Sequence, residues 1–324
     1  MSVIQEWSLS PSNPIRHEPQ SLSDVYALHG ATLVTIYSSI IGASLMIVDS
    51  VRLKKHETLS GRFPIYMAGL NFCWSVSHSI DHLWMILLKG DNPPDTACRI
   101  LGGVLSVFMI AELFLTDIMA LFMLATVYYG NRVSLGSYDW ILFVLVIGGP
   151  ICYAIIAGSI GALGHDYYWC FLDISGSAGR VMMGITAAAA CLCVAIPAIC
   201  FFLIYRKLKE HANNIKGTIS SGGFTASVIK KLLVFQGIVT FSFCGIAVTG
   251  ITISAFKREP TGLVWLTVLT INSGGWINAI AYFLQEYSHR RDHRNKGVDA
   301  SSAKPSASLT AQMSEVKKSA ATDI

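Results

Sequence analysis

The chain has 324 residues, of which 52% are hydrophobic and only 14% are charged, and its formal net charge is +4. Soluble domains carry roughly 25% charged residues, so this deficit indicates a membrane protein. No basic face with interleaved aromatic residues accompanies the positive charge, which argues against nucleic-acid binding.

Seven apolar stretches follow one another along the chain. They are Leu28–Val51, Pro64–Leu88, Leu101–Tyr128, Trp140–Leu163, Val181–Tyr205, Leu232–Phe256 and Gly262–Leu284. Each is long enough as a helix to cross a hydrocarbon core about 30 Å thick. Because lipid offers no hydrogen-bond partners to the backbone, runs of this length must be helical. The predicted fold class is an all-α membrane protein, a seven-transmembrane-helix bundle over residues 28–284.

The basic residues predict an orientation for this bundle. Eighteen of the 24 Lys and Arg residues fall in the first, third and fifth connections and in the segment after the last stretch. By the positive-inside rule, the N-terminus is extracellular and the C-terminus is cytoplasmic. Residues 1–27 are then a short extracellular tail. We therefore expect a multi-pass membrane protein that resides in the plasma membrane.

Two segments follow the bundle. Residues 285–298 begin with QEYSHRRDHR, and we interpret them as an amphipathic helix along the inner lipid headgroups. Residues 299–324 are rich in Ser, Ala, Lys and Thr, and we predict a disordered cytoplasmic tail. Its hydroxyl residues include Ser306, Ser308, Thr310 and Ser314. Phosphorylation of these residues and a simple solvated tail are both open interpretations.

Two of the eight cysteines differ in position from the rest. Six lie inside apolar stretches, whereas Cys98 and Cys170 lie at a segment end and in a loop on the predicted outer side. Disulfides persist in oxidising compartments, so these two cysteines are predicted to pair. Two free thiols are the alternative. The sequence has no CxxC spacing, and we expect neither a bound metal nor a cofactor.

Polar residues inside the second and third stretches are the candidates for chemistry. Those of the second stretch recur at three- and four-residue steps and share one face; they are Asn71, Trp74, Ser75, His78, Asp81 and His82. The third stretch carries Glu112 and Asp117, and no Lys or Arg occurs within the apolar cores. These acids must therefore be protonated, paired with histidine, hydrated, or in contact with a ligand. Ligand coupling and purely structural hydrogen bonding both fit this pattern.

Later stretches contain residues that suit a change of shape. Asn272, Gly275, Asn278 and Tyr282 share a face that is expected to point into the bundle. The glycine pair Gly274–Gly275 favours a bend or a close helix approach, and Pro197 is a second candidate kink.

Enzyme signatures are absent from the sequence, which has no P-loop, GxSxG or HExxH motif. A retinal-binding seven-helix protein needs a lysine in the middle of its last helix, and Gly262–Leu284 has none. A small transporter that uses the buried acids and histidines as a proton or substrate path is the main alternative function. The lack of an internal repeat argues against the commonest transporter designs. A membrane hydrolase with a site at His78, Asp81 and His82 is a third possibility.

Taken together, the arrangement over residues 28–290 resembles a G-protein-coupled receptor. Residues Val127–Gly130 (VYYG) are not the Asp-Arg-Tyr of rhodopsin-like receptors, and Asn-Pro-x-x-Tyr is missing from the last stretch. The Trp169-Cys170 dipeptide and the sequence GWINAIAY at Gly275–Tyr282 look like the cAMP-receptor-like group, which is related to secretin-like receptors. The N-terminal region is too short for the cysteine-rich hormone-binding domain of secretin receptors.

The resemblance implies a signalling role and assigns candidate residues to it. An extracellular ligand, for example a small anion such as a cyclic nucleotide, would bind in a pocket formed by His78, Asp81, His82, Trp84, Glu112, Trp169 and Trp276. A switch would involve Asp117, Pro197, Gly275, Asn278 and Tyr282. A heterotrimeric G protein would bind near Tyr128, Tyr129, Arg206, Lys207, Lys230 and Lys231. Kinase or arrestin-like proteins would contact the tail.

Overall fold

The structure is a computed structural model that describes residues 16–17, 21–57, 59–89, 93–129, 135–166, 168–214 and 221–302. Its chain divides into two compact units, Met1–Ala281 and Tyr282–Ile324. The hydroxyl residues Ser306, Ser308, Thr310 and Ser314 and most of the predicted disordered tail lie outside the described residues.

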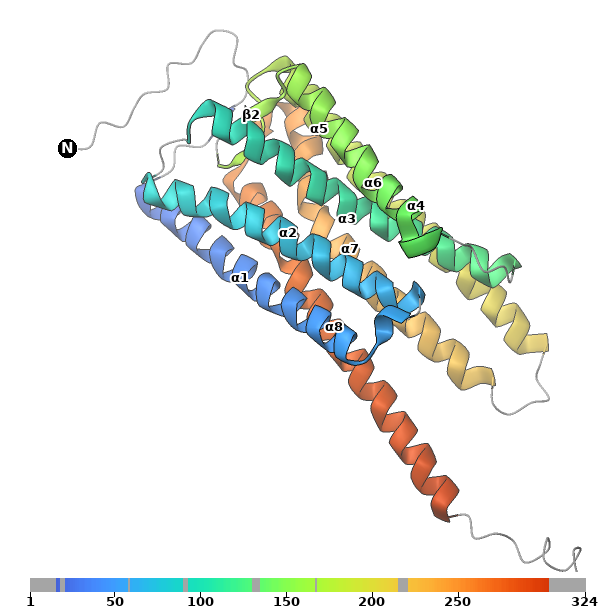
Figure 1. Cartoon of the computed structure of the whole chain (residues 1–324). Helices are drawn as coiled ribbons and strands as arrows, with labels where there is room; N and C mark the ends of the chain where they lie inside the picture. Colours follow the sequence, from blue (N-terminus) through green and yellow to red (C-terminus); the bar gives the residue numbers. More distant parts are fainter. Residues whose placement is uncertain are drawn as a thin grey trace, which may run out of the picture. The chain divides into compact units, whose positions relative to one another are not determined.

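Long helices make up the first unit (Figure 1). They are α1 (Leu22–Arg52), α2 (Leu59–Leu87), α3 (Asp95–Tyr129), the composite helix Trp140–Ser159, α6 (Ser177–Asn214), α7 (Ser221–Phe256) and the first part of α8 (Thr261–Ser302). Short 3₁₀ turns, η1 (Lys55–Glu57) and η2 (Ser137–Asp139), precede α2 and the composite helix. The predicted seven-helix arrangement is present in these residues.

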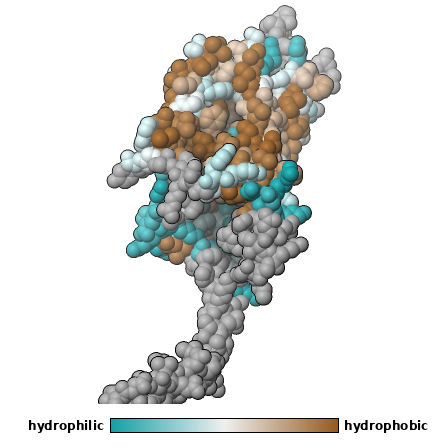
Figure 2. Space-filling view, turned by 90° about the vertical axis from the view of Figure 1, so that its right-hand side faces the viewer, coloured by the Kyte–Doolittle hydropathy of each residue, from teal (hydrophilic) through white to brown (hydrophobic). Residues whose placement is uncertain are grey.

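Six of these helices are long and apolar enough to span a membrane. The remaining one, α2, carries the polar stripe predicted from its sequence, and this stripe lowers its hydropathy. All six stripe residues are buried, so the stripe faces the bundle as predicted. Figure 2 shows broad apolar areas on one face of the molecule. The protein is a multi-pass membrane protein.

Helix α3 is central to the bundle. It packs against α2, α5 (Gly149–Ser159), α6 and both strands of a small hairpin. Its buried residues extend from Cys98 to Ala120. The core cluster around it joins residues of α2, α6, α7 and the first part of α8.

The composite helix contains one irregular turn. It consists of α4 (Trp140–Phe143), the π-helical turn η3 (Val144–Gly148) and α5. Pro150 has no N–H to donate, so the regular hydrogen-bond ladder cannot continue through it, and a wider turn accommodates the break. A Cβ at Gly149 would lie 2.8 Å from Phe114, so glycine permits close packing on α3.

The end of this helix corrects one predicted boundary. The sequence predicts a helix to Leu163, but α5 ends at Ser159, and Leu163 begins strand β2 (Leu163–His165). Gly161 has a φ of +69°, a left-handed conformation that glycine adopts easily and that terminates the helix. Strand β2 pairs with β3 (Cys170–Leu172) in antiparallel register, with His165 opposite Cys170.

Other ends also differ from the apolar stretches. Helix α1 begins at Leu22 with Ser21 as its N-cap, and Ser21 and Asp24 form a reciprocal capping box. A second pair of strands, β1 (Arg16–His17) and β4 (Arg258–Glu259), runs parallel. In the second unit, α8 continues helically to Ser302. Helical structure thus covers the segment 285–298, while its position along the headgroups stays a prediction.

Candidate functional site

The hairpin β2–β3 is tethered to α3 at one end of the bundle. Cys98 and Cys170 form the predicted disulfide, with their Cα atoms 4.9 Å apart. Gly102 lies beneath β3, where an added Cβ would approach the carbonyl oxygen of Phe171 to 2.7 Å. Glycine therefore lets the strand backbone lie directly on α3. We call this end of the bundle the disulfide end.

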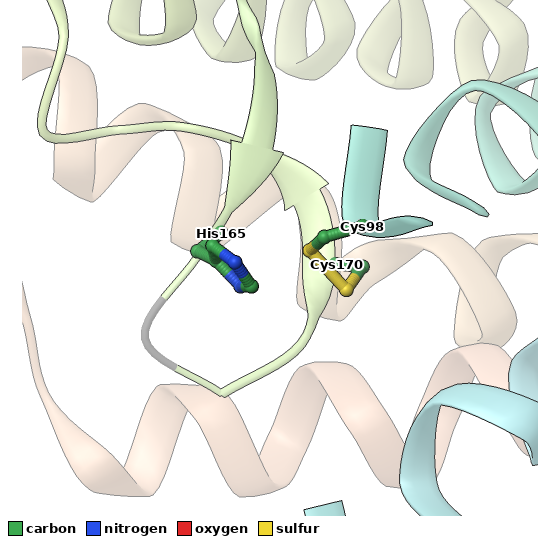
Figure 3. Close-up of side chains that lie close together, drawn as sticks. All are labelled: Cys98, His165 and Cys170. Atoms are coloured by element: carbon green, nitrogen blue, oxygen red, sulfur yellow. A yellow bond between two sulfur atoms is a disulfide. The ribbon is translucent and has the colours of Figure 1, made fainter. Parts of the chain in front are cut away.

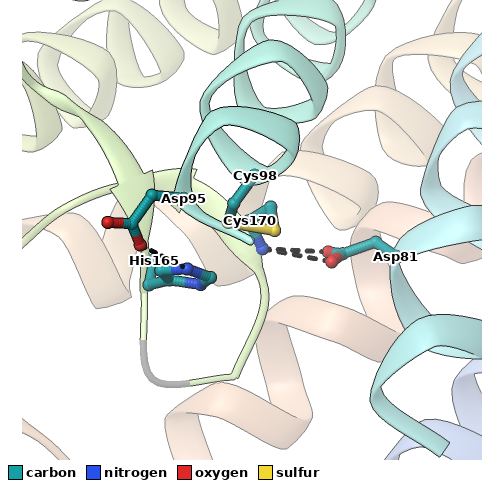
Figure 4. The surroundings of a disulfide bond; sticks show 5 residues. All are labelled: Asp81, Asp95, Cys98, His165 and Cys170. Carbon is teal, nitrogen blue, oxygen red and sulfur yellow. Dashed lines mark hydrogen bonds and ion pairs between the residues drawn. A yellow bond between two sulfur atoms is a disulfide. The ribbon is translucent and has the colours of Figure 1, made fainter. Parts of the chain in front are cut away.

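Two polar contacts add to this tether (Figure 4). The Asp81 carboxylate is fully buried and accepts the backbone N–H of Cys170, with N–O distances of 3.1 and 3.2 Å. Asp81 thereby connects α2 to the strand that the disulfide connects to α3. At the start of α3, Asp95 lies 3.1 Å from Nε2 of His165. The hairpin is therefore held from both α2 and α3.

The hairpin brings one further set of potential ligating atoms together. Cys98, His165 and Cys170 lie close enough to suggest a metal site (Figure 3). The two sulfur atoms are bonded to each other, so neither is a thiolate that can bind a metal. These residues do not fit a metal while the disulfide is intact.

A chain of histidines crosses from α1 to α2 in the core. His29 Nδ1 lies 2.6 Å from His82 Nδ1, and His82 Nε2 lies 3.2 Å from His78 Nε2. His78 Nδ1 in turn lies 2.8 Å from Oδ1 of Asn272 on α8. All four side chains are buried. The chain links three helices through side-chain hydrogen bonds alone.

A second buried polar cluster lies nearer the middle of the bundle. Asn71 donates to Oε1 of Glu112 at 2.8 Å, which joins α2 to α3. A Cβ at Gly274 would lie 3.1 Å from the Ser242 hydroxyl and 3.7 Å from the same glutamate oxygen. The Glu112 side chain is thus held by an amide inside the bundle.

A cavity lies beneath the hairpin at the disulfide end. Its empty volume is about 470 Å³, the open space at its mouth included. Helices α2, α3, α6, α7 and α8 and the hairpin all contribute to its wall. The lining residues are Trp74, His78, Leu105, Met109, Asp166, Trp169, Phe171, Met183, Ile246, Thr249, Thr267, Val268 and Ile271. Ligand sites in proteins are lined mainly by apolar and aromatic groups, as this cavity is.

Only two of the seven predicted pocket residues, His78 and Trp169, line this cavity. His82 and Glu112 are instead bonded to neighbouring helices, and Asp81 holds the hairpin. Trp84 is half-buried on α2. Trp276 lies against α1, where its backbone N–H donates to the Ser39 hydroxyl at 3.3 Å.

The predicted switch residues take part in different contacts between helices. A Cβ at Gly275 would lie 2.7 Å from that of Ser39, so α8 approaches α1 closely there, as the glycine pair suggested. Asn278 is buried on α8, and Pro197 is buried within a continuous α6. Asp117 on α3 is hydrogen-bonded to the Cys193 thiol of α6. The structure does not join these residues into one cluster; Tyr282 belongs to the second unit.

At the other end of the bundle, α3 meets α6. The Tyr128 hydroxyl donates to the Leu203 carbonyl oxygen at 3.3 Å, and the Lys207 ammonium lies 5.9 Å from the centre of the Tyr128 ring. Tyr129 and Arg206 are exposed. Lys230 and Lys231 belong to α7, but their side chains are outside the described set. We call this end the Tyr128 end.

Sequence reasoning missed an ion pair that joins α2 to the composite helix. Arg62 donates to both oxygens of Asp139, at 2.6 and 2.9 Å, and Tyr66 donates to the same carboxylate at 2.7 Å. Asp139 is buried and has a positive φ of 56°. A lone acid directly before an apolar run was the available signal.

Comparisons with known proteins support the fold. The sequence matches no model of a known protein family and no curated protein. Among solved structures, squid rhodopsin is similar, with a TM-score of 0.69 over 85% of this chain and 80% of that chain. The two sequences are 14% identical, so the likeness concerns the fold alone. The chain has a rhodopsin-like seven-helix fold.

Proposed function

We propose that this membrane protein is a G-protein-coupled receptor that binds an extracellular ligand beneath the hairpin and a heterotrimeric G protein at the Tyr128 end. The observation that carries the proposal is the cavity at the disulfide end of a rhodopsin-like bundle. Membership of the cAMP-receptor-like group rests on the short motifs Trp169-Cys170 and Gly275–Tyr282 alone.

The cavity wall suits a ligand-driven change of shape. A molecule in it would contact α2, α3, α6, α7, α8 and the hairpin together. A ligand shifts a conformational equilibrium only by the difference between its affinities for the two states. A site shared by six elements is sensitive to their relative displacement. Ligand binding there would favour one packing of α6 and α7 over another.

The opposite end offers a surface for the G protein. Arg206 and Lys207 follow Leu203 on α6, close to Tyr128, and Lys230 and Lys231 lie on α7. In the proposed orientation these residues are cytoplasmic. A displacement of α6 relative to α3 would break the Tyr128–Leu203 hydrogen bond and expose new surface.

Nucleotide exchange on co-expressed Gα subunits tests the receptor proposal. Cells that display the protein at their surface are exposed to a broad ligand panel, and exchange is compared with that of cells that lack it. The expected result is ligand-dependent exchange, weakened when Arg206 and Lys207 are both replaced by alanine. If a correctly folded surface population never promotes exchange on any Gα, the proposal fails.

The buried histidine chain favours a second candidate, a proton-coupled transporter. Imidazoles in hydrogen-bonded series can pass protons, and His29, His82 and His78 form such a series. The series ends at the Asn272 carboxamide, which is not a titrating group, and this counts against a continuous path. Proton-coupled uptake by reconstituted vesicles, lost in Glu112→Gln, would favour transport over signalling.

A further inference from the structure

We propose that the cavity beneath the hairpin takes a compact, uncharged and largely apolar molecule. This inference deepens the proposed receptor function and names the chemical class of the ligand. It rests on how the polar atoms around the cavity are already used.

The polar groups contributed by α2 are engaged within the protein. Trp74 Nε1 donates to Oδ1 of Asn272 at 3.2 Å, and His78 uses Nδ1 for the same oxygen and Nε2 for His82. Both ring nitrogens of His78 are therefore occupied. What Trp74 and His78 present to the cavity is ring surface.

The two threonines of the wall are engaged in the same way. The hydroxyl oxygens of Thr249 on α7 and Thr267 on α8 lie 2.8 Å apart, and Thr249 also donates to the Leu263 carbonyl oxygen at 3.4 Å. A polar ligand would have to compete with these bonds, whereas an apolar ligand leaves them intact.

The rest of the wall consists almost entirely of carbon and sulfur. Its members are Leu105, Met109, Trp169, Phe171, Met183, Ile246, Val268 and Ile271. Two methionines make the wall adaptable, because their side chains are flexible and polarisable. Aromatic rings suit flat apolar molecules, which gain from both burial and ring packing.

Charge around the cavity argues against an anion. None of the described lining residues is Lys or Arg. The charged residue in the wall is Asp166, which would repel an anionic ligand. An anion would therefore lose its hydration without gaining a partner.

A cation is the other charged possibility. Asp166 already interacts within the protein, and its backbone is bonded to that of Trp169 across the hairpin turn. One acid, in a wall whose other polar groups are already hydrogen-bonded within the protein, is a poor replacement for the hydration shell of an ammonium group. The wall as a whole favours a neutral ligand.

Three probes of the same carbon skeleton test whether the cavity prefers a neutral, a cationic or an anionic ligand. Naphthalene-methanol, naphthylmethylamine and naphthoate share one carbon skeleton and are neutral, cationic and anionic near pH 7. Binding to the full chain in nanodiscs is measured by ligand-observed NMR, with empty nanodiscs subtracted for partition into lipid. We expect the neutral probe to bind about tenfold more tightly than either charged probe. Preference for the anion or the cation overturns the inference.

Paired substitutions test the location. Met183→Trp fills the cavity from α6, and Leu192→Trp alters an exposed position on the same helix. The first should weaken the neutral probe about tenfold and the second by less than about twofold. Val268→Phe, with Leu266→Phe as its control, repeats the test from α8 in case Met183→Trp does not fold. Equal affinities within both pairs would mean that the probe binds elsewhere.

The outcomes separate this inference from the receptor proposal. The binding measurement contains no G protein, so neutral-probe binding, together with a failure of the whole ligand panel to promote nucleotide exchange, upholds the site and contradicts the receptor. Nucleotide exchange driven by an anionic ligand upholds the receptor and contradicts the apolar ligand class.

Discussion

The Trp74 indole N–H donates to the side-chain oxygen of Asn272, 3.2 Å away. An indole nitrogen can only donate, so the Asn272 atom must be oxygen, and its amide nitrogen correctly faces the Val268 carbonyl oxygen. His78 Nδ1 must then be protonated to donate to this oxygen. If the rings are neutral, the protons of His82 lie on Nε2 and those of His29 on Nδ1. One indole thus determines the tautomers of three histidines.

Replacing Asn272 by leucine should destabilise the bundle. The change leaves the donors of Trp74 and His78 buried without an acceptor, which costs about 1–3 kcal/mol. Thermal unfolding in nanodiscs measures the loss. Thr252→Val is the control, because that exposed hydroxyl bonds to the Val248 carbonyl oxygen of its own helix. An unchanged melting temperature for Asn272→Leu would show that the chain of tautomers is not maintained.

Replacing Cys98 and replacing Cys170 should lower the stability of the protein by equal amounts. The bond closes a loop with a sequence separation of 72 residues, for which chain entropy predicts a loss of about 4 kcal/mol. Cys98→Ser and Cys170→Ser should lower surface expression equally, and the double variant should be no worse than either single one. Additive losses in the double variant would mean that the cysteines contribute separately.

Asp81 should tolerate asparagine but not leucine. An amide oxygen can still accept the Cys170 N–H, whereas leucine leaves that donor buried and the hairpin free of α2. We expect Asp81→Leu to lower stability by about 1–3 kcal/mol and Asp81→Asn to keep most of it. Binding of the neutral naphthalene probe reports the hairpin position. Equal damage by both substitutions would indicate that the charge matters more than the acceptor.

Stability should depend on pH through Glu259, in the connection between α7 and α8. Burial raises the pKa of its carboxyl from 4.5 to about 8. Below the ordinary pKa both folded and unfolded chains hold the proton. Between these values the unfolded chain ionises first, so the free energy of unfolding falls as pH rises, and the loss is complete above the folded-state pKa.

Glu259→Gln removes this titration and provides the test. The variant should melt at a higher temperature than the unmodified protein at pH 8, and the difference should shrink toward pH 4. Glu210→Gln changes an exposed carboxylate and controls for the loss of one charge. A difference that does not vary with pH would contradict the assignment.

The sequence predicted the features that depend on composition along the chain. Apolar length predicted the helices, and three- and four-residue steps correctly placed Asn71 to His82 on a buried face. The cysteine pair follows from its location outside the apolar runs. The helices and the polar face are each determined within one segment, whereas the cysteine prediction combines two segments on the same predicted side of the membrane.

Partnerships between helices were not predictable in this way. His29 is a lone histidine in its apolar helix, and only the packing of α1 on α2 brings it to His82. Asp81 and Glu112 were assigned to the ligand pocket because their partners could not be identified from the sequence. These partners, the Cys170 N–H and the Asn71 amide, lie elsewhere in the chain. Cavity walls combine residues from six elements, so no local pattern identifies them.

The Arg62–Asp139 pair should act as one unit with Tyr66. Arg62 donates two parallel hydrogen bonds to the carboxylate, a geometry that lysine cannot reproduce. Once the guanidinium is removed, the buried Asp139 has no comparable partner. Arg62→Lys should therefore lower stability nearly as much as Arg62→Gln, by about 1–3 kcal/mol.

In a double-mutant cycle with Asp139→Asn, the second substitution should cost far less than it does alone, because its partner is already absent. Tyr66→Phe removes one hydroxyl donor and should show a smaller coupling. If the stability losses measured by thermal unfolding are strictly additive, Arg62 and Asp139 do not stabilise each other.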